Sequence, residues 1–188
     1  MIREAEIKKA LSNYIKEKNN YTDSCIVEEL RLNGGEIRAD IVDLNEMHCY
    51  EIKSEGDSLN RLIRQGTQYG KTFDKVTIVA ARCHLEKVIE IVPSWWGIIV
   101  INEKEEKFLK SFRQAKINKR VLSPEDLATL FSKEEALSVL DNFDTSKGWK
   151  SKSLYKIQSH IAGLLSLDEL KYSVKESLLK RLNSECII

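Results

Sequence analysis

The sequence predicts a mixed α/β fold with a C-terminal helical extension. Between residues 25 and 101, strand-like and helix-like segments alternate, which favours a mixed β-sheet flanked by helices. After about residue 115, only short capped helices follow. A chain of 188 residues with 42% hydrophobic content is long enough for one core and a small second unit. We therefore expect a core over residues 1–117 and a helical extension over residues 118–188, with the packing of the extension on the core left open.

Composition excludes several classes of protein. No run of about 18 apolar residues is present, and the N-terminus opens an amphipathic helix, so we expect neither a membrane span nor a signal peptide. We expect a cytoplasmic location. The four cysteines lie far apart without a Cys-x-x-Cys pair, which favours buried free thiols over a zinc site. The net charge of +1 does not by itself indicate a nucleic-acid partner.

A helix and three strands are expected in the first part of the core. Residues 2–18 carry a helical apolar stripe that includes Ile7, Leu11 and Ile15. A polar loop follows, and then three short segments separated by Gly34-Gly35 and Asn45-Glu46, which are placed as hairpin turns would be. The three strands are expected at residues 25–31, Ile37–Asp43 and His48–Lys53.

Helices and strands alternate in the second part of the core. Asp57 or Ser58 is a suitable N-cap for a helix over residues 59–73. The expected buried stripe of this helix consists of Leu59, Leu62, Ile63, Gly66 and Phe73. Nearly continuous apolar runs are typical of strands covered on both faces. The remaining segments are expected at residues 76–81 (strand), 84–92 (helix ended by Pro93), 98–101 (strand) and 102–108 (charged ribbon).

Helix caps mark the extension. Ser123-Pro124 opens a short helix, the run from Ser132 to Glu135 is a capping box before another, and the run from Ser166 to Glu169 opens a third. Residues 141–152, with Gly148 and several polar side chains, form the expected linker.

Three carboxylates are expected in a row across the first three strands. If Asn45-Glu46 is a two-residue turn, counting back along both strands sets Asp40 opposite Glu51. If Gly34-Gly35 is the preceding turn, Glu29 lies opposite Asp40. Side chains alternate along a strand, so Lys53 joins the carboxylates. Like charges opposite each other destabilise a sheet, and a bound cation is one remedy. Chance placement of acids on exposed strands stays open as the alternative.

Other polar groups lie on neighbouring helices. Gln65 and Tyr69 are one helical turn apart, as a boundary hydrogen bond or a site residue pair would be. Glu4 and Glu6, in the first turn of the N-terminal helix, either face the sheet or simply favour the helix end. The cations of the helix over residues 59–73, which a solvated surface would also carry, are Arg61, Arg64 and Lys71.

In this order, the motifs resemble the PD-(D/E)XK nuclease superfamily. Asp40, then Glu51-Ile52-Lys53 on the next strand, is similar to its core motif, although Ala39 stands where the name has Pro. Gln65 and Tyr69 match the Gln-x-x-x-Tyr element of several branches. The match is fuller with the sce7726-like family of uncharacterised bacterial and phage proteins, through residues 38–42, 50–54, 57–59, 73–74 and 93–98. The resemblance covers residues 1–117.

The resemblance implies a restriction-endonuclease-like core that hydrolyses phosphodiester bonds, most readily in DNA. Asp40, Glu51 and the backbone carbonyl of Ile52 would bind Mg²⁺, which Mn²⁺ can replace, and Glu29 would hold a second metal or a metal-bound water. Lys53 would orient the attacking water, and Gln65 and Tyr69 would steady the site. The cations expected to contact backbone phosphates are Arg61, Arg64 and Lys71.

Two alternatives stay open. In the first, the chain is a catalytically inactive nucleic-acid-binding or scaffold protein on the same fold. In the second, its helical tail docks a partner protein. A near-neutral chain also leaves room for a homodimer or a partner that supplies basic surface.

Overall fold

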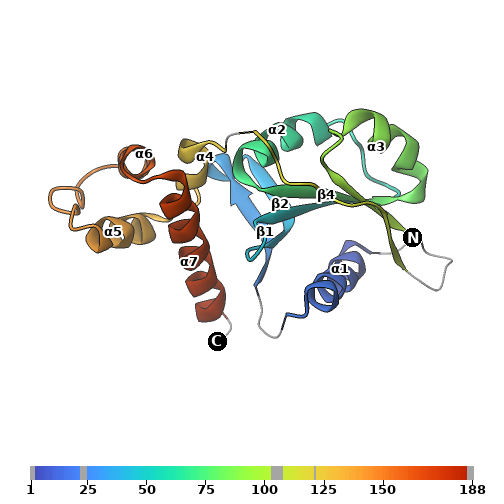
Figure 1. Ribbon diagram of the computed structural model, residues 1–188, viewed down its shortest axis with the longest axis horizontal. Coiled ribbons are helices and arrows are strands. Elements are labelled where there is room, and N and C mark those ends of the chain that lie inside the picture. The colour runs from blue at the N-terminus through green and yellow to red at the C-terminus, as the bar shows by residue number, and fades with distance from the viewer. Residues whose placement is uncertain (1–2, 22–24, 103–107, 121, 186–188) are drawn as a thin grey trace. The chain divides into compact units, whose positions relative to one another are not determined.

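A computed structural model describes residues 3–21, 25–102, 108–120 and 122–185 (Figure 1). A six-stranded mixed sheet runs in the order β1-β2-β3-β4-β5-β6, with helices before, between and after its strands. The predicted α/β class with C-terminal helices is confirmed. The chain divides into two compact units, one made of Met1–Leu30 and Arg38–Arg120 and the other of Arg31–Ile37 and Val121–Ile188. The core and extension proposed for residues 1–117 and 118–188 stay a prediction.

The three N-terminal strands match the sequence prediction closely. They are β1 (Ile26–Leu32), β2 (Ile37–Asp43) and β3 (His48–Lys53). β2 pairs antiparallel with β3, with Ile41 opposite Tyr50, and the same register places Asp40 beside Glu51. The register predicted from Asn45-Glu46 is therefore confirmed. The turn before β2 is a short 3-10 helix (Asn33–Gly35) instead of a two-residue loop, and positive φ angles at Gly34 and Gly35 allow it.

Two parallel strands and an antiparallel edge complete the sheet. β4 (Lys75–Ala81) pairs parallel with β3, and β5 (Gly97–Ile101) pairs parallel with β4. β6 (Leu109–Arg113) pairs antiparallel with β5. Of the charged ribbon predicted over residues 102–108, residues 103–107 lie outside the described residues, and the edge strand begins at Leu109.

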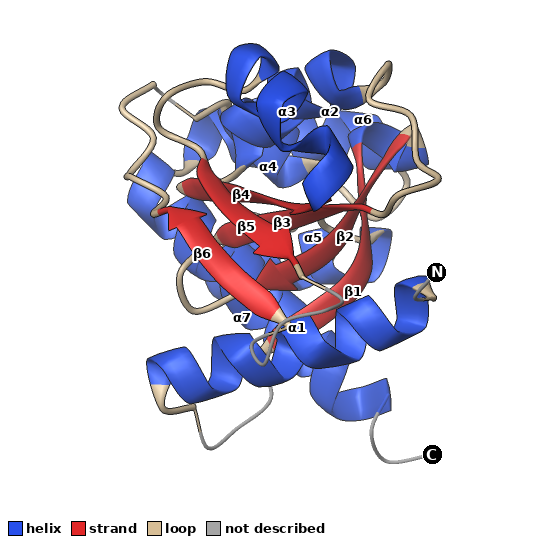
Figure 2. Ribbon diagram, turned by 90° about the vertical axis from the view of Figure 1, so that its right-hand side faces the viewer, coloured by secondary structure: helices blue, strands red, loops and turns tan. Residues whose placement is uncertain are grey.

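Helices cover both faces of the sheet (Figures 1 and 2). α1 (Glu4–Asn19) lies on one face and buries Ile7, Leu11 and Ile15. α2 (Leu62–Thr72) and α3 (Leu85–Ile91) lie on the other face. The prediction that Ile63 is buried is wrong, because its side chain is 70% exposed. The neighbouring Leu62 faces the sheet, and successive helical residues point about 100° apart.

Four helices lie in the second unit. Their bounds are α4 (Pro124–Ala128), α5 (Lys133–Asn142), α6 (Leu154–Leu164) and α7 (Leu167–Glu185). The predicted caps are confirmed, since the hydroxyls of Ser123 and Ser132 accept the backbone N–H groups of Asp126 and Glu135. Arg181 of α7 donates to the Glu135 carboxylate and so ties α7 to α5.

The predicted buried thiols are confirmed at two positions and wrong at a third. Cys25 and Cys49 are buried, whereas Cys83 is exposed because it sits in a short 3-10 helix after β4. Cys186 lies outside the described residues. Among the described helices, none combines the length and the apolar character needed to cross a membrane.

Candidate functional site

A buried carboxylate, Glu51, is the centre of a hydrogen-bond network between β3 and α2. Its side chain is only 1% exposed. Its Oε1 accepts hydrogen bonds from Lys53 Nζ and from Gln65 Nε2, both at 2.7 Å. Its Oε2 accepts the hydroxyl of Tyr69. A buried charge is costly unless it is paired and hydrogen-bonded, and these three donors meet that need.

Helix α2 places two of these donors by its geometry. Gln65 and Tyr69 lie one turn apart, so both reach the same carboxylate. Close packing holds the helix there: a Cβ on Gly66 would lie 2.9 Å from the ring of Trp96. Burial, and then the nearby charges of Cys49 and Glu51, raise the pKa of Tyr69, which keeps the phenol protonated as a donor. The phenol therefore serves Glu51 as a hydrogen-bond donor.

Asp40 lies beside the buried Glu51 carboxylate, and its own carboxyl group has a raised pKa. Its Oδ2 accepts the backbone N–H of Ile52 at 2.6 Å. Burial, and then the charge of Glu51, raise the pKa of Asp40 to about 7, against the opposing hydrogen bond from Ile52. This carboxyl group therefore titrates near neutral pH.

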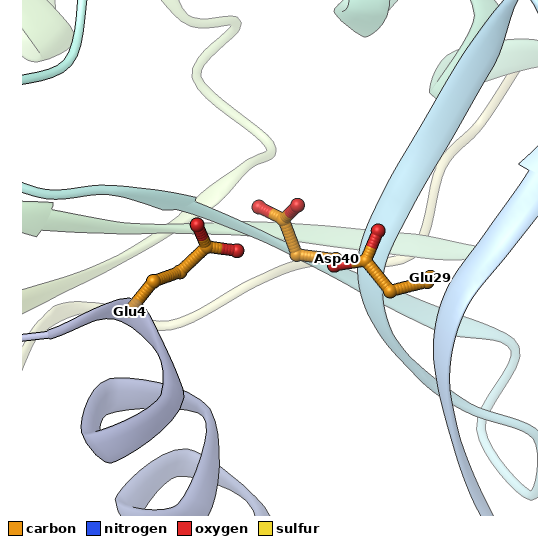
Figure 3. A group of neighbouring side chains, drawn as sticks. All are labelled: Glu4, Glu29 and Asp40. Atoms are coloured by element: carbon orange, nitrogen blue, oxygen red, sulfur yellow. The ribbon is translucent and has the colours of Figure 1, made fainter.

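Asp40 also lies between two other acids, Glu4 and Glu29 (Figure 3). Carboxylate oxygens of Glu4, Glu29 and Asp40 lie within 4.8 Å of one another. Lys8, one turn after Glu4, forms ion pairs with both Glu4 and Glu29. Arg38 also pairs with Glu29. Two cationic side chains of the protein thus stand among the three acids.

The predicted site residues are brought together, but in a different grouping. Asp40, Glu51, Lys53, Gln65 and Tyr69 are close neighbours, as the register and the helix spacing predicted. Among the described residues, the acids placed to share a cation are Glu4, Glu29 and Asp40, whereas the oxygens of Glu51 already accept hydrogen bonds from protein donors. A divalent ion would fit the first three only if Lys8 moved aside. Magnesium binding stays a prediction.

The cations assigned to nucleic acid lie on the surface. Arg61, Arg64 and Lys71 are all exposed, the first at the start of α2 and the others within it. Their positions along the helix place them within about 80° of one another around its axis. They form one basic face, which we call the α2 basic face.

The sequence did not predict two cations of this charge network as site residues. Lys8 and Arg38 both form ion pairs with Glu29. Lys8 belongs to no motif, and Arg38 stands at the start of the segment 38–42 that carried the family resemblance. The signal available for Lys8 was its position four residues after Glu4, a spacing at which helical side chains pair. His48, the first residue of β3, lines a cavity on the opposite face of the sheet.

Comparison with known proteins identifies a phage protein family. The family model described as bacteriophage P4 protein cII matches residues 1–187. Protein cII of Enterobacteria phage P4 is similar to this chain, with 35% identity over 100 residues. That alignment covers 53% of this chain and 38% of the phage protein, so the chain matches well under half of that relative's length. No solved structure matches the chain.

These matches overturn the resemblance to the PD-(D/E)XK superfamily and its sce7726-like family. The prediction of a magnesium-dependent nuclease or hydrolase is wrong with it, because the matching family is protein cII and its description names no nuclease. The motif misled because it is short. An acid and a lysine two residues apart lie on one face of any strand and are close enough to form an ion pair, as Glu51 and Lys53 do here.

Proposed function

The chain belongs to the bacteriophage P4 protein cII family, and from that premise we propose that it is a non-catalytic nucleic-acid-binding protein that contacts DNA through the α2 basic face. The exposed row of Arg61, Arg64 and Lys71 carries the proposal. Cationic side chains on one helix face suit the regularly spaced phosphates of a duplex.

The buried network supports this proposal by fixing the helix. Gln65 and Tyr69 attach α2 to Glu51 on the inner side, so the outer side presents its cations on a rigid element. In this interpretation Glu51 and Lys53 are structural, and Asp40 lies at the edge of the same network. The ion pairs of Lys8 and Arg38 keep the neighbouring acids from repelling DNA.

Binding of this kind is independent of sequence and sensitive to salt. Each phosphate contact changes the slope of log K against log salt by about −0.9, so three contacts predict a slope of about −3. A net charge of +1 adds little attraction beyond these contacts. We place the protein in the cytoplasm, where phage or host DNA is accessible.

The test is to titrate the protein into a fluorescently labelled DNA duplex at several salt concentrations. Fluorescence anisotropy measures the binding. The triple variant Arg61→Gln, Arg64→Gln and Lys71→Gln should bind at least about tenfold more weakly and lose most of the salt slope. The matched control replaces three exposed lysines, Lys150, Lys152 and Lys156, by Gln and so removes the same charge. Equal weakening in both triple variants would contradict an α2 site.

A second assay tests the non-catalytic part of the proposal. Plasmid DNA incubated with the protein and Mg²⁺ should stay intact. Cleavage by the wild type that disappears in Asp40→Ala would overturn it.

A second candidate function is docking of a protein partner, or of a second copy of the chain, by the C-terminal helices. The exposed aromatic side chains of Tyr155 on α6 and Tyr172 on α7, 76% and 67% exposed, favour it. Light scattering of the wild type and of Tyr172→Lys tests for self-association: a dimer that dissociates in the variant supports this function, and a monomer in both excludes the homodimer.

A further inference from the structure

A polar cavity lies on the face of the sheet opposite the Glu51 network. It has a volume of about 130 Å³ and lies between α1 and the strands β3, β4, β5 and β6. Lining residues from the strands include His48, Tyr50, Thr77 and Ser111, and Tyr14 and Lys18 come from α1. Cavities that hold drug-sized ligands measure about 300–1,000 Å³, so this one suits a group of a few heavy atoms.

Its floor is made of buried polar side chains where a packed sheet would carry apolar ones. His48, Tyr50 and Thr77 are 7%, 3% and 3% exposed. They lie at one end of β3 and β4, where Tyr50 pairs with Thr77, whereas the next pair along the same face is Ile52 with Val79. Burying polar groups costs free energy unless they are hydrogen-bonded, so this local change from apolar to polar needs a reason.

The floor is arranged around a neutral histidine. His48 Nε2 lies 2.7 Å from Thr77 Oγ1, and its ring stacks on Tyr50 with centroids 4.1 Å apart. Gly97 leaves room for the Thr77 hydroxyl, since a Cβ there would lie 2.3 Å from Oγ1. Burial, and then the charges of Lys75 and Lys18, lower the pKa of His48 to about 3, so the ring adds no charge near pH 7.

Two hydroxyl protons are available to a ligand. Among the described residues, no hydrogen bond joins the Tyr50 hydroxyl to a protein acceptor, although this side chain lines the cavity. The Ser111 hydroxyl accepts a hydrogen bond from Gln114, which leaves its own proton free to donate. The cavity therefore offers O–H donors, which suit a ligand with hydrogen-bond acceptor atoms.

The charges around the cavity are mainly positive. Lys18, Lys75 and Arg113 line it, with Glu46 as its acidic member. Glu46 pairs with Lys75, and Arg113 donates to the backbone carbonyls of Trp96 and Pro93. Lys18 is engaged by a neutral partner, Gln114, at 3.1 Å. A net positive lining with hydroxyl donors matches the chemistry of an oxyanion.

We propose that this cavity binds a small oxyanion, the phosphate or carboxylate group of a small molecule, with Lys18 and Lys75 supplying charge and the Tyr50 and Ser111 hydroxyls supplying directed hydrogen bonds. The site is separate from the α2 basic face, which lies on the other side of the sheet. It stands whether or not the protein binds DNA.

Calorimetric titration of the full chain with sodium phosphate and, separately, sodium acetate tests the proposal, with sodium chloride at equal ionic strength as the baseline. Saturable binding of phosphate, of acetate or of both is expected, and the comparison identifies the preferred group. Loss of one hydrogen bond to a charged group should weaken the affinity of Tyr50→Phe about tenfold, and Ser111→Ala, at the exposed edge, should show a similar loss.

Matched controls separate the cavity from general charge effects. Tyr155→Phe removes a hydroxyl that is exposed on α6, and Lys9→Met removes a charge from the same helix as Lys18→Met but away from this cavity. Both controls should bind within about twofold of the wild type, whereas Lys18→Met binds about tenfold more weakly. No saturation above the chloride baseline, or equal losses in variants and controls, would overturn the proposal.

Discussion

The two faces of the central sheet both carry polar side chains, and they use them differently. On the α2 face, Glu51 accepts hydrogen bonds from three protein donors and is 1% exposed. On the α1 face, His48 and Tyr50 are nearly as buried but surround a cavity. In the first set, the polar groups satisfy one another's hydrogen bonds. The second leaves donors directed at a space, and this difference is why we treat the first as a structural network and propose the second as an oxyanion site.

The comparison also shows how a charged motif misleads. The α2 face contains the acid, lysine, glutamine and tyrosine that a nuclease pattern needs, yet each of these groups is paired with another. The α1 face contains no recognisable motif, yet its hydroxyl donors face a cavity. Polar residue types in a pattern are therefore weaker evidence for a site than unfilled hydrogen-bonding capacity.

Breaking the Glu51–Lys53 ion pair should produce the largest effect. Lys53→Met leaves the Glu51 carboxylate buried without its cation, which should lower the free energy of unfolding by about 3–5 kcal/mol. Glu51→Gln should cost a similar amount by leaving the lysine unpaired. Chemical denaturation of both single variants and the double variant measures the coupling. The double variant should recover much of the loss, and strictly additive losses would show that the pair is not coupled.

The pH dependence of stability should differ in sign between the two faces. The pKa of Asp40 is raised from 3.8 to about 7, so the folded state holds this proton more tightly and stability is lost as pH rises through that interval. The pKa of His48 is lowered from 6.5 to about 3, so its contribution is lost as pH falls through that interval. Asp40→Asn should therefore gain stability relative to the wild type as pH rises, by about 2 kcal/mol after allowance for partial exposure.

Thermal unfolding across this pH range measures both effects. By contrast, His48→Gln should gain stability relative to the wild type as the pH falls. Asp141→Asn, an exposed substitution on α5, is the control and should follow the wild type at every pH. A difference for Asp40→Asn that does not vary with pH would refute its assigned titration.

Replacing Lys8 should produce the smallest effect and test the magnesium prediction. Lys8→Met removes the cation shared by Glu4 and Glu29 and should destabilise the protein by about 1 kcal/mol in the presence of a chelator. Mg²⁺ should restore part of that loss, because the three acids then have room for an ion. Differential scanning fluorimetry with and without Mg²⁺ provides the measurement. An equal response of Lys8→Met and the wild type to Mg²⁺ would count against any ion at these acids.

The sequence predicted local structure and register well. Turn dipeptides and the two-residue period of strands were sufficient for the bounds of β2 and β3 and for Asp40 beside Glu51. Serine caps predicted where α4 and α5 begin. Ile63 was misplaced because the buried side of α2 depends on where the helix starts, which the 3.6-residue period alone does not determine.

By itself the sequence determined the strands, the caps and which acids share a face, because these depend on neighbours close along the chain. Tertiary structure alone decided what those acids do. Glu51 meets Tyr69 only when α2 packs against β3, and Glu29 meets Lys8 only when α1 reaches the sheet edge. The cavity at His48 depends likewise on α1 and β6, segments about 100 residues apart whose contact only folding creates.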